Sequence, residues 1–228
     1  KDFNKLSKLI RLSKRSNNPV ACLIKKNTFS KVIKKNPIPL KALLRSDVLE
    51  KLLRKIKKNS LLISTTGYTS RELHQLRKLK KIKNGKDFYM VGSMGHVSSL
   101  TLGISLFSKK ETICIDGDGS VLMHLGSLVT AGNLGNKNFK HILLNNFSHE
   151  SVGGQKTLAK KIDFKNLVKS IGYKKYFFSD NKKNFDLKLK KFLKSSGPSF
   201  FEIRVLNKSM KNLERPKDLK LIKKHFIK

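Results

Sequence analysis

Short apolar runs alternate with segments of helical periodicity over most of the chain. The runs predict six β-strands, at residues 61–65, 87–91, 112–116, 141–146, 173–179 and 199–206. Helices are predicted from about Asp47, from a cap at Ser70, up to Phe107, over 120–133, over 163–171 and over 184–194. Most of the runs are apolar throughout rather than alternating, so both sheet faces must be covered. The pattern therefore predicts an α/β fold, a doubly wound and mostly parallel sheet of about six strands with helices on both faces.

The two ends of the chain differ from this central pattern. Residues 3–15 predict a short basic helix and residues 19–25 a strand, while residues 27–41 carry prolines and few periodic apolar positions, which is typical of a linker. From residue 207 onward the chain is basic and poor in apolar residues. The expected organisation is an N-terminal segment (1–30), a linker (31–45), the α/β domain (46–206) and a basic C-terminal tail (207–228).

Glycines and polar residues follow four of the predicted strands. They lie after 61–65, 87–91, 112–116 and 141–146. In an open parallel sheet, ligands bind in the crevice at the carboxyl ends of the strands. We therefore expect these four loops to converge on one site.

The sharpest motif is Asp116-Gly117-Asp118-Gly119-Ser120, followed one strand later by Asn146. Glycines at the start of a helix let the backbone approach a phosphate group. The carboxylate of Asp118 and the amide oxygen of Asn146 are ligands that suit Mg²⁺ beside a diphosphate. A tight strand-to-helix turn followed by an asparagine pair is the structural alternative. A nicotinamide site is less well supported, because the turn lacks the GxGxxG pattern.

The formal net charge of +36 raises the possibility of nucleic-acid binding. The cations are spread along the whole chain, however, and lysine greatly outnumbers arginine, so we favour a solvated lysine-rich surface and expect no nucleic-acid partner. A positive field can also collect an anionic substrate. With no apolar stretch of membrane-spanning length and no secretory signal, the sequence predicts a cytoplasmic protein without a membrane partner.

The motif Gly117-Asp118-Gly119 through Asn145-Asn146 resembles the signature of thiamine-diphosphate-dependent 2-oxo acid decarboxylases. The resemblance implies thiamine diphosphate and Mg²⁺ as cofactors and a thiamine diphosphate-binding fold. The implied metal ligands are Asp118, Asn146 and the backbone carbonyl of Ser148. The implied cofactor contacts are Gly117, Gly119 and Ser120 at the diphosphate, Gly92 and Ser93 beside the aminopyrimidine ring, and Met94 as the prop for its bent conformation.

Three longer strings, at residues 64–73, 87–96 and 145–155, resemble the phosphonopyruvate decarboxylases and, less closely, their sulfopyruvate relatives. This implies decarboxylation of 3-phosphonopyruvate to phosphonoacetaldehyde and CO₂, within phosphonate metabolism. Thr66 and Gly67 would face the diphosphate, and the loop with Gly153 would fold over the cofactor. Ser70 and Arg71 are candidate substrate contacts, and His149 is a candidate catalytic proton carrier.

The segment from Pro19 to Lys26 resembles the last strand of that family's pyrimidine-binding domain, so residues 1–30 are expected to be its C-terminal remnant. The family uses a glutamate of that domain to activate the cofactor, and no glutamate here matches it. Because the chain also begins at Lys1, we expect a fragment that is inactive alone, that needs the pyrimidine-binding domain of a neighbouring chain, and that forms a homo-oligomer.

Three alternatives remain open at this point. The chain could be a sulfopyruvate decarboxylase, with the same chemistry and another anionic head group. It could be another thiamine diphosphate enzyme, such as an acetolactate synthase-like carboligase. From a different class, it could be a non-catalytic basic binding protein built on the same fold.

Overall fold

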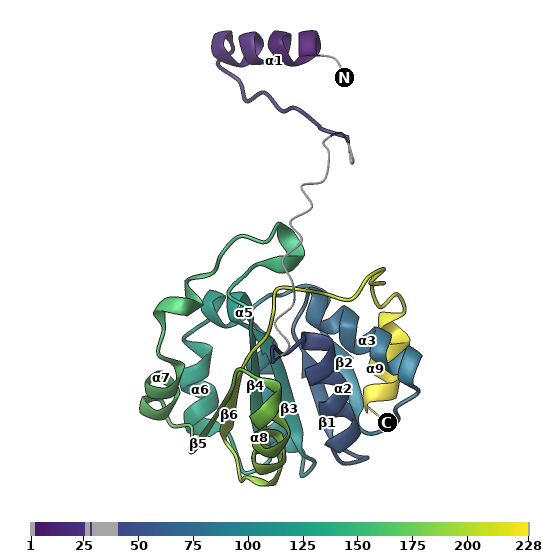
Figure 1. Cartoon of the computed structure of the whole chain (residues 1–228), viewed down its shortest axis with the longest axis vertical. Helices are drawn as coiled ribbons and strands as arrows, with labels where there is room; N and C mark the ends of the chain where they lie inside the picture. Colours follow the sequence, from purple (N-terminus) through teal and green to yellow (C-terminus); the bar gives the residue numbers. More distant parts are fainter. Residues whose placement is uncertain (1–2, 26–27, 29–40, 228) are drawn as a thin grey trace. The chain divides into compact units, whose positions relative to one another are not determined.

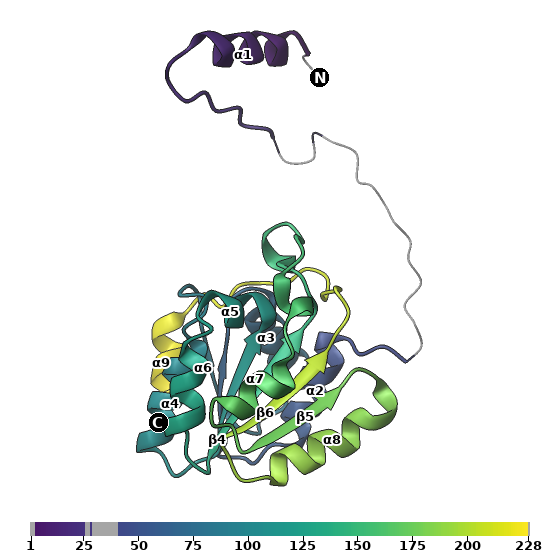
Figure 2. The same cartoon turned by 90° about the vertical axis from the view of Figure 1, so that its left-hand side faces the viewer.

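The computed structural model describes residues 3–25, 28 and 41–227, which fall into two units, residues 1–38 and 39–228 (Figures 1 and 2). The first unit contains helix α1 (Phe3–Arg15), which has no buried residue. All other helices and strands belong to the second unit. Among the described residues, no helix combines the length and the apolar character that a membrane crossing requires.

A parallel sheet of six strands forms the centre of the second unit. The strands are β1 (Leu61–Ser64), β2 (Lys86–Tyr89), β3 (Thr112–Gly117), β4 (Phe139–Asn145), β5 (Lys175–Ser179) and β6 (Ser199–Arg204). Their order in the sheet is β2-β1-β3-β4-β6-β5, and all five pairings are parallel. The order reverses between β1 and β3, and such a switch point leaves a crevice at the carboxyl ends of the strands.

Helices cover both faces of the sheet, as the sequence predicts. Side chains alternate along β1, so that Leu62 packs in one apolar cluster while Leu61 and Ile63 pack in the other. The first cluster includes residues of α2 (Arg45–Lys55), α3 (Tyr68–Lys80) and α8 (Lys182–Lys194). The second includes residues of α4 (Val97–Phe107), α5 (Asp118–Met123), α6 (Ser127–Leu134) and α7 (Phe164–Ser170).

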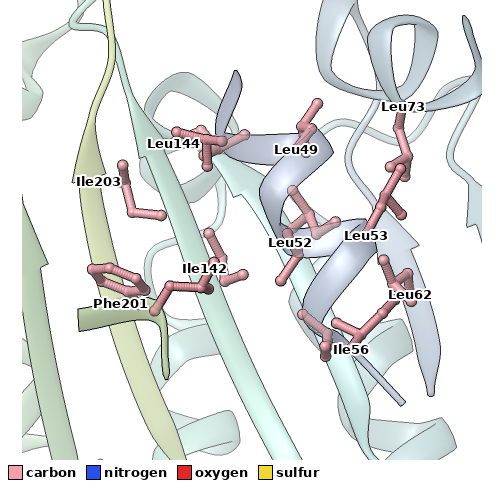
Figure 3. Packing of buried hydrophobic residues seen from close by; sticks show 14 of the residues in the cluster. Leu49, Leu52, Leu53, Ile56, Leu62, Leu73, Ile142, Leu144, Phe201 and Ile203 are labelled. Carbon is pink, nitrogen blue, oxygen red and sulfur yellow. The ribbon is translucent and has the colours of Figure 1, made fainter. Parts of the chain in front are cut away.

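The stripe of leucines on α2 shows how the core forms. Leu49, Leu52 and Leu53 recur at helical spacing and are fully buried against the sheet, where Ile142 and Phe201 face them (Figure 3). Burial of each such side chain contributes roughly 1.5–3 kcal/mol. The predicted α/β fold, with an all-parallel sheet of six strands, is confirmed.

The strand expected over residues 19–25 is not formed. These residues form neither a helix nor a strand, and Leu23 is 96% exposed. A strand is stable only when a neighbour accepts and donates its backbone hydrogen bonds, and no other strand of the described residues pairs with this one. The apolar run is therefore a poor guide to structure outside a sheet.

Two predicted helices begin or end elsewhere. The helix expected over 120–133 is divided into α5 and α6, because His124 leaves the helical conformation at φ −133° and ψ 51°. The helix expected to be capped by Ser70 already begins at Tyr68, after Gly67 at φ 83°. Ser70 lies in its first turn, where the hydroxyl donates to the carbonyl of Gly67 at 3.1 Å.

The described parts of the expected linker and tail contain buried residues and helices. Residues 31–40 lie outside the described residues, but Leu43 is buried and α2 already begins at Arg45. The C-terminal residues form α9 (Leu219–Ile227), which packs along β2 and brings the ring of Phe226 to 5.6 Å from that of Phe88. Two short 3₁₀ helices, η1 (Glu150–Val152) and η2 (Leu158–Lys161), lie between β4 and α7.

Candidate functional site

A cleft of about 250 Å³ opens at the carboxyl ends of β1, β3 and β4, beside the switch point of the sheet. Most of the residues singled out from the sequence line it: Thr66, Gly67, Ser70, Arg71, Met94, Gly117, Asp118, Gly119, Ser120, Asn146, Ser148 and His149. Gly92, Ser93 and Gly153 are exposed and are not among the lining residues. Met90, Val91 and Met94 line the cleft from the loop after β2 as well. The expected convergence of four separate loops on one crevice is therefore confirmed.

Asp118 is the first residue of α5 and is 2% exposed. Burial raises the pKa of its carboxyl group, and hydrogen bonds from the Thr157 hydroxyl and from backbone amides offset only part of that rise. No lysine, arginine or histidine of the described residues forms an ion pair with it. A buried carboxylate at the edge of a cleft without a protein cation is a suitable ligand for a metal ion.

Gly119 lets two other candidate residues approach the turn after β3. A Cβ atom at this position would lie 2.6 Å from the imidazole ring of His149 and 3.2 Å from the Cε atom of Met94. The absence of a side chain at Gly119 is thus required for the observed packing. The glycine turn, the candidate prop Met94 and the candidate proton carrier His149 therefore meet at one place.

The hydroxyl of Ser120 joins two walls of the cleft. Its Oγ accepts hydrogen bonds from Thr65 Oγ1 at 2.9 Å and from the backbone amide of Gly95 at 3.1 Å. These bonds connect the turn after β3 to the end of β1 and to the loop after β2. Both lone pairs of Ser120 Oγ are used in these bonds, which leaves its O–H as the group that can donate to an anionic ligand in the cleft.

Asn146 follows the last residue of β4, and both ends of its side-chain amide are held. Its Nδ2 donates to Glu150 Oε2 at 3.2 Å, and its Oδ1 accepts from the backbone amide of Ser148 at 3.1 Å. The loop beyond it folds back on itself, because Ser148 bridges to Lys156. The oxygen of Asn146 and the carboxylate of Asp118 line the same cleft, as their predicted role as metal ligands requires.

An ion-pair cluster beside the cleft was not found from the sequence. Arg45 donates to both carboxylate oxygens of Glu72, at 2.9 and 3.3 Å, and to Glu150 Oε2 at 2.9 Å. Burial alone would lower the pKa of the guanidinium, but the two carboxylates raise the pKa above its ordinary value. Arg45 was assigned to the linker, and its partners are 27 and 105 residues away, so no local pattern reveals the cluster.

Two further arginines line the cleft without an acidic partner. Arg71 lies with its guanidinium 5.5 Å from the ring centre of Tyr68, and Arg215 enters the lining from the segment before α9. Neither forms an ion pair within the described part of the chain. Arg215 was missed because residues 207–228 were expected to be a solvated tail. Both guanidinium groups are therefore available to an anionic ligand in the cleft.

Comparison with known proteins agrees with this arrangement. Residues 65–203 match the family described as thiamine pyrophosphate enzyme, C-terminal TPP binding domain. The chain is 35% identical over 173 residues to a phosphonopyruvate decarboxylase of Streptomyces viridochromogenes, covering 76% of this chain and 42% of that protein. It is 37% identical over 147 residues to the sulfopyruvate decarboxylase subunit beta of Methanothermobacter thermautotrophicus, covering 64% of this chain and 74% of that subunit. The chain thus spans less than half the length of the phosphonopyruvate decarboxylase.

Proposed function

This chain belongs to the thiamine pyrophosphate enzymes and carries their C-terminal TPP-binding domain, and on that premise we propose that it forms the diphosphate- and Mg²⁺-binding half of a 2-oxo acid decarboxylase site. The observation that carries the proposal is the meeting of Asp118, Asn146 and the Gly117–Ser120 turn in one cleft. When bound, thiamine diphosphate supplies a thiazolium ring that adds to the keto carbon of a 2-oxo acid and accepts the electrons left by CO₂.

The chain's own groups hold and orient the cofactor. Asp118, Asn146 and the carbonyl of Ser148 provide the protein ligands of Mg²⁺, and the amides of the Gly117–Ser120 turn face the diphosphate. Met94 would support the cofactor, and His149, whose ring packs on Gly119, would carry a proton. These roles match the cleft lining, with Gly92, Ser93 and Gly153 as more peripheral contacts of a bound cofactor.

The proposed substrate is 3-phosphonopyruvate, converted to phosphonoacetaldehyde and CO₂. Relatives of similar identity act, by their names, on phosphonopyruvate and on sulfopyruvate, so sulfopyruvate is the second candidate. Both carry a strongly anionic head group, and the unpaired Arg71 and Arg215 support such a substrate. We assign the head group to these two arginines, because Arg45 is already bound by the carboxylates of Glu72 and Glu150.

The proposed site also needs a partner. The two glutamates nearest the cleft, Glu72 and Glu150, are both bound to Arg45 and are not free to serve the aminopyrimidine ring. We therefore propose that a pyrimidine-binding domain of a neighbouring chain supplies that glutamate, in a homo-oligomer. One group of relatives is named as subunit beta, which is consistent with a site shared between chains.

Equilibrium binding of thiamine diphosphate to the 228-residue chain, with Mg²⁺ and with the ion chelated, is the first test. Binding that requires the divalent ion is expected, and binding unaffected by chelation would contradict the assigned metal ligands. CO₂ release is then measured with phosphonopyruvate, sulfopyruvate and pyruvate, with and without an added pyrimidine-binding domain. Release only with that domain, and fastest with phosphonopyruvate, is expected; a preference for sulfopyruvate would change the substrate but keep the site.

Arg71→Ala and Arg215→Ala test the assignment of the head group. Each change is expected to raise KM for phosphonopyruvate by about tenfold or more, because a charge-assisted hydrogen bond contributes roughly 1.5–3 kcal/mol. KM for pyruvate, which lacks the second anion, should change little. An equal rise for both substrates would mean that the arginines act on the fold or the cofactor instead.

A further inference from the structure

We propose that Glu150 is a positioning residue that fixes which end of the Asn146 amide faces the bound cation, and that Arg45 holds Glu150 in that position. The inference rests on the proposed function, because it takes Asn146 as a ligand of the divalent ion. It adds a role for a glutamate and an arginine that lie outside the signature from Gly117 to Asn146.

The first step is the chemistry of the asparagine side chain. A carboxamide has an oxygen that can bind a cation and an NH₂ group that cannot, and the two differ little in size. A half-turn of the side chain would therefore replace the ligand with a group that repels the ion. An asparagine ligand works only if its neighbours distinguish its two ends.

Asn146 has two neighbours that do so. The carboxylate of Glu150 can only accept a hydrogen bond, so the NH₂ group must face it, at 3.2 Å. The backbone amide of Ser148 can only donate, so the oxygen must face it, at 3.1 Å. Both contacts specify the same orientation. One lone pair of Oδ1 then remains for a cation in the cleft, which Asn146 lines together with Asp118.

The second step is the anchoring of Glu150 itself. It begins a single 3₁₀ turn whose other two residues, Ser151 and Val152, are exposed. The side chain of Glu150 is nevertheless 13% exposed, because Nη1 of Arg45 binds the same Oε2 atom that receives Asn146. Arg45 is in turn fixed through Nε and Nη2 by Glu72, whose side chain is fully buried. The chain of contacts thus runs from α3 through α2 to the cation ligand.

The molecule also contains a matched pair that lacks this function. Asn145, one residue earlier, donates its Nδ2 to Glu202 Oε1 at 3.0 Å, and its Oδ1 accepts from the backbone amide of Phe147 at 3.3 Å. The pattern is the same, but Asn145 and Glu202 are buried and neither lines the cleft. Glu202→Gln is therefore a control for the loss of an asparagine–glutamate pair as such.

The experiment measures Mn²⁺ affinity of the 228-residue chain in the presence of thiamine diphosphate, by the loss of the free-ion electron paramagnetic resonance signal. Glu150→Gln is expected to weaken Mn²⁺ binding by about 10–100-fold, the usual effect of losing a group that orients a metal ligand. Glu202→Gln should leave the affinity within about threefold of the wild type while lowering the melting temperature.

A second background separates positioning from simple anchoring of the loop. Asn146→Asp offers an oxygen at both ends of the side chain, so its orientation no longer matters. In that background Glu150→Gln should not weaken Mn²⁺ binding, because neither end of the side chain has to be selected and the change also removes a carboxylate that would lie against the one introduced at position 146. A loss of the same size in both backgrounds, or no loss in either, would overturn the role of Glu150. If the wild-type chain takes up no Mn²⁺ with thiamine diphosphate, the proposed function fails and this inference with it.

Discussion

Asp116 and Asp118 lie two residues apart in one motif and are equally buried, at 1% and 2% exposure, but they belong to different regions. Asp116 faces the sheet interior, where one oxygen accepts from the amide of Gly117 and the other lies 3.6 Å from His141 Nε2. Asp118 lines the cleft, and its protein contacts leave room for a ligand. Burial alone therefore does not identify a binding carboxylate; access from the cleft does.

The interior region is polar but closed. Cys114, Asp116 and His141 place their ligand atoms within 4.8 Å of one another between β3 and β4, and Nδ1 of His141 is 3.0 Å from the hydroxyl of Tyr173. Burial raises the pKa of Cys114 and of Tyr173, which keeps both groups protonated. Substitutions in this region and in the apolar core should change stability, whereas substitutions at the cleft should change binding.

The largest effect is expected from the apolar core. Phe201→Ala should lower the free energy of unfolding by about 3–5 kcal/mol. The side chain of Phe201, on β6, is fully buried and packs against the rings of Phe185 and Phe192. Chemical denaturation followed by circular dichroism measures this change. Affinity for Mg²⁺ with thiamine diphosphate should stay at the wild-type value at temperatures where the variant is folded. A loss of affinity without a loss of stability would contradict the separation of the two regions.

The next effect belongs to the cleft. Asp118→Ala should weaken Mg²⁺-dependent binding of thiamine diphosphate by at least about 100-fold, measured by calorimetry, since the change removes a proposed ligand of the ion.

The thermal stability of the Asp118→Ala variant should not fall together with its cofactor binding. The folded-state pKa of Asp118 lies above its ordinary value, so its contribution to stability is present at acid pH and is lost as the pH rises through the folded-state pKa. Above that pKa the ionised carboxylate thus opposes folding, and there the cation-free variant should melt no lower than the wild type. Unchanged cofactor binding would remove Asp118 from the ligand set.

The fold was predictable to the extent that local patterns determine it. Continuous apolar runs such as 112–116 and 141–146 can only be strands with both faces covered, and they are. The division between α5 and α6 was missed because the residues around His124 to Gly126 keep an apolar periodicity through the turn. The run at 19–25 was misread because strand formation depends on a partner that a pattern cannot supply.

In the cleft, too, residues that belong to a local sequence motif could be predicted, whereas residues brought together from distant segments could not. Asp118, Asn146 and the glycines stand at fixed spacings after strands, so the sequence could place them on one edge of the sheet. Arg45, Glu72 and Glu150 come from three segments whose contact depends on how α2, α3 and the loop after β4 pack. Arg215 lines the cleft from the segment between β6 and α9, far in sequence from the strands that form it. The residues next to these four in the sequence do not indicate that they lie at the cleft.

A smaller effect is expected inside the sheet. Asp116→Asn keeps the shape of the side chain and an oxygen for the amide of Gly117, but it removes the negative charge beside His141. We expect a loss of about 1–3 kcal/mol in the free energy of unfolding, the usual range for a buried polar group that loses its partner. Thermal or chemical denaturation measures it. Mg²⁺ affinity should remain within about threefold of the wild type; a loss as large as that of Asp118→Ala would merge the two regions into one site.

The smallest effect is expected at the protein surface, where an exposed ion pair can be compared with the buried ion pairs of Arg45. Lys51 and Asp186 form an ion pair at 2.5 Å between α2 and α8, but their side chains are 39% and 49% exposed. Water and salt screen such a pair, so Asp186→Asn should lower the free energy of unfolding by no more than about 1 kcal/mol, and less at high ionic strength. Glu72→Gln removes one charged partner of the buried Arg45 while Glu150 stays in place, so this change should lower the free energy of unfolding by about 1–3 kcal/mol. Equal losses from the two changes would show that the buried cluster at Arg45 is held by packing, and that its ion pairs are not what anchors Glu150.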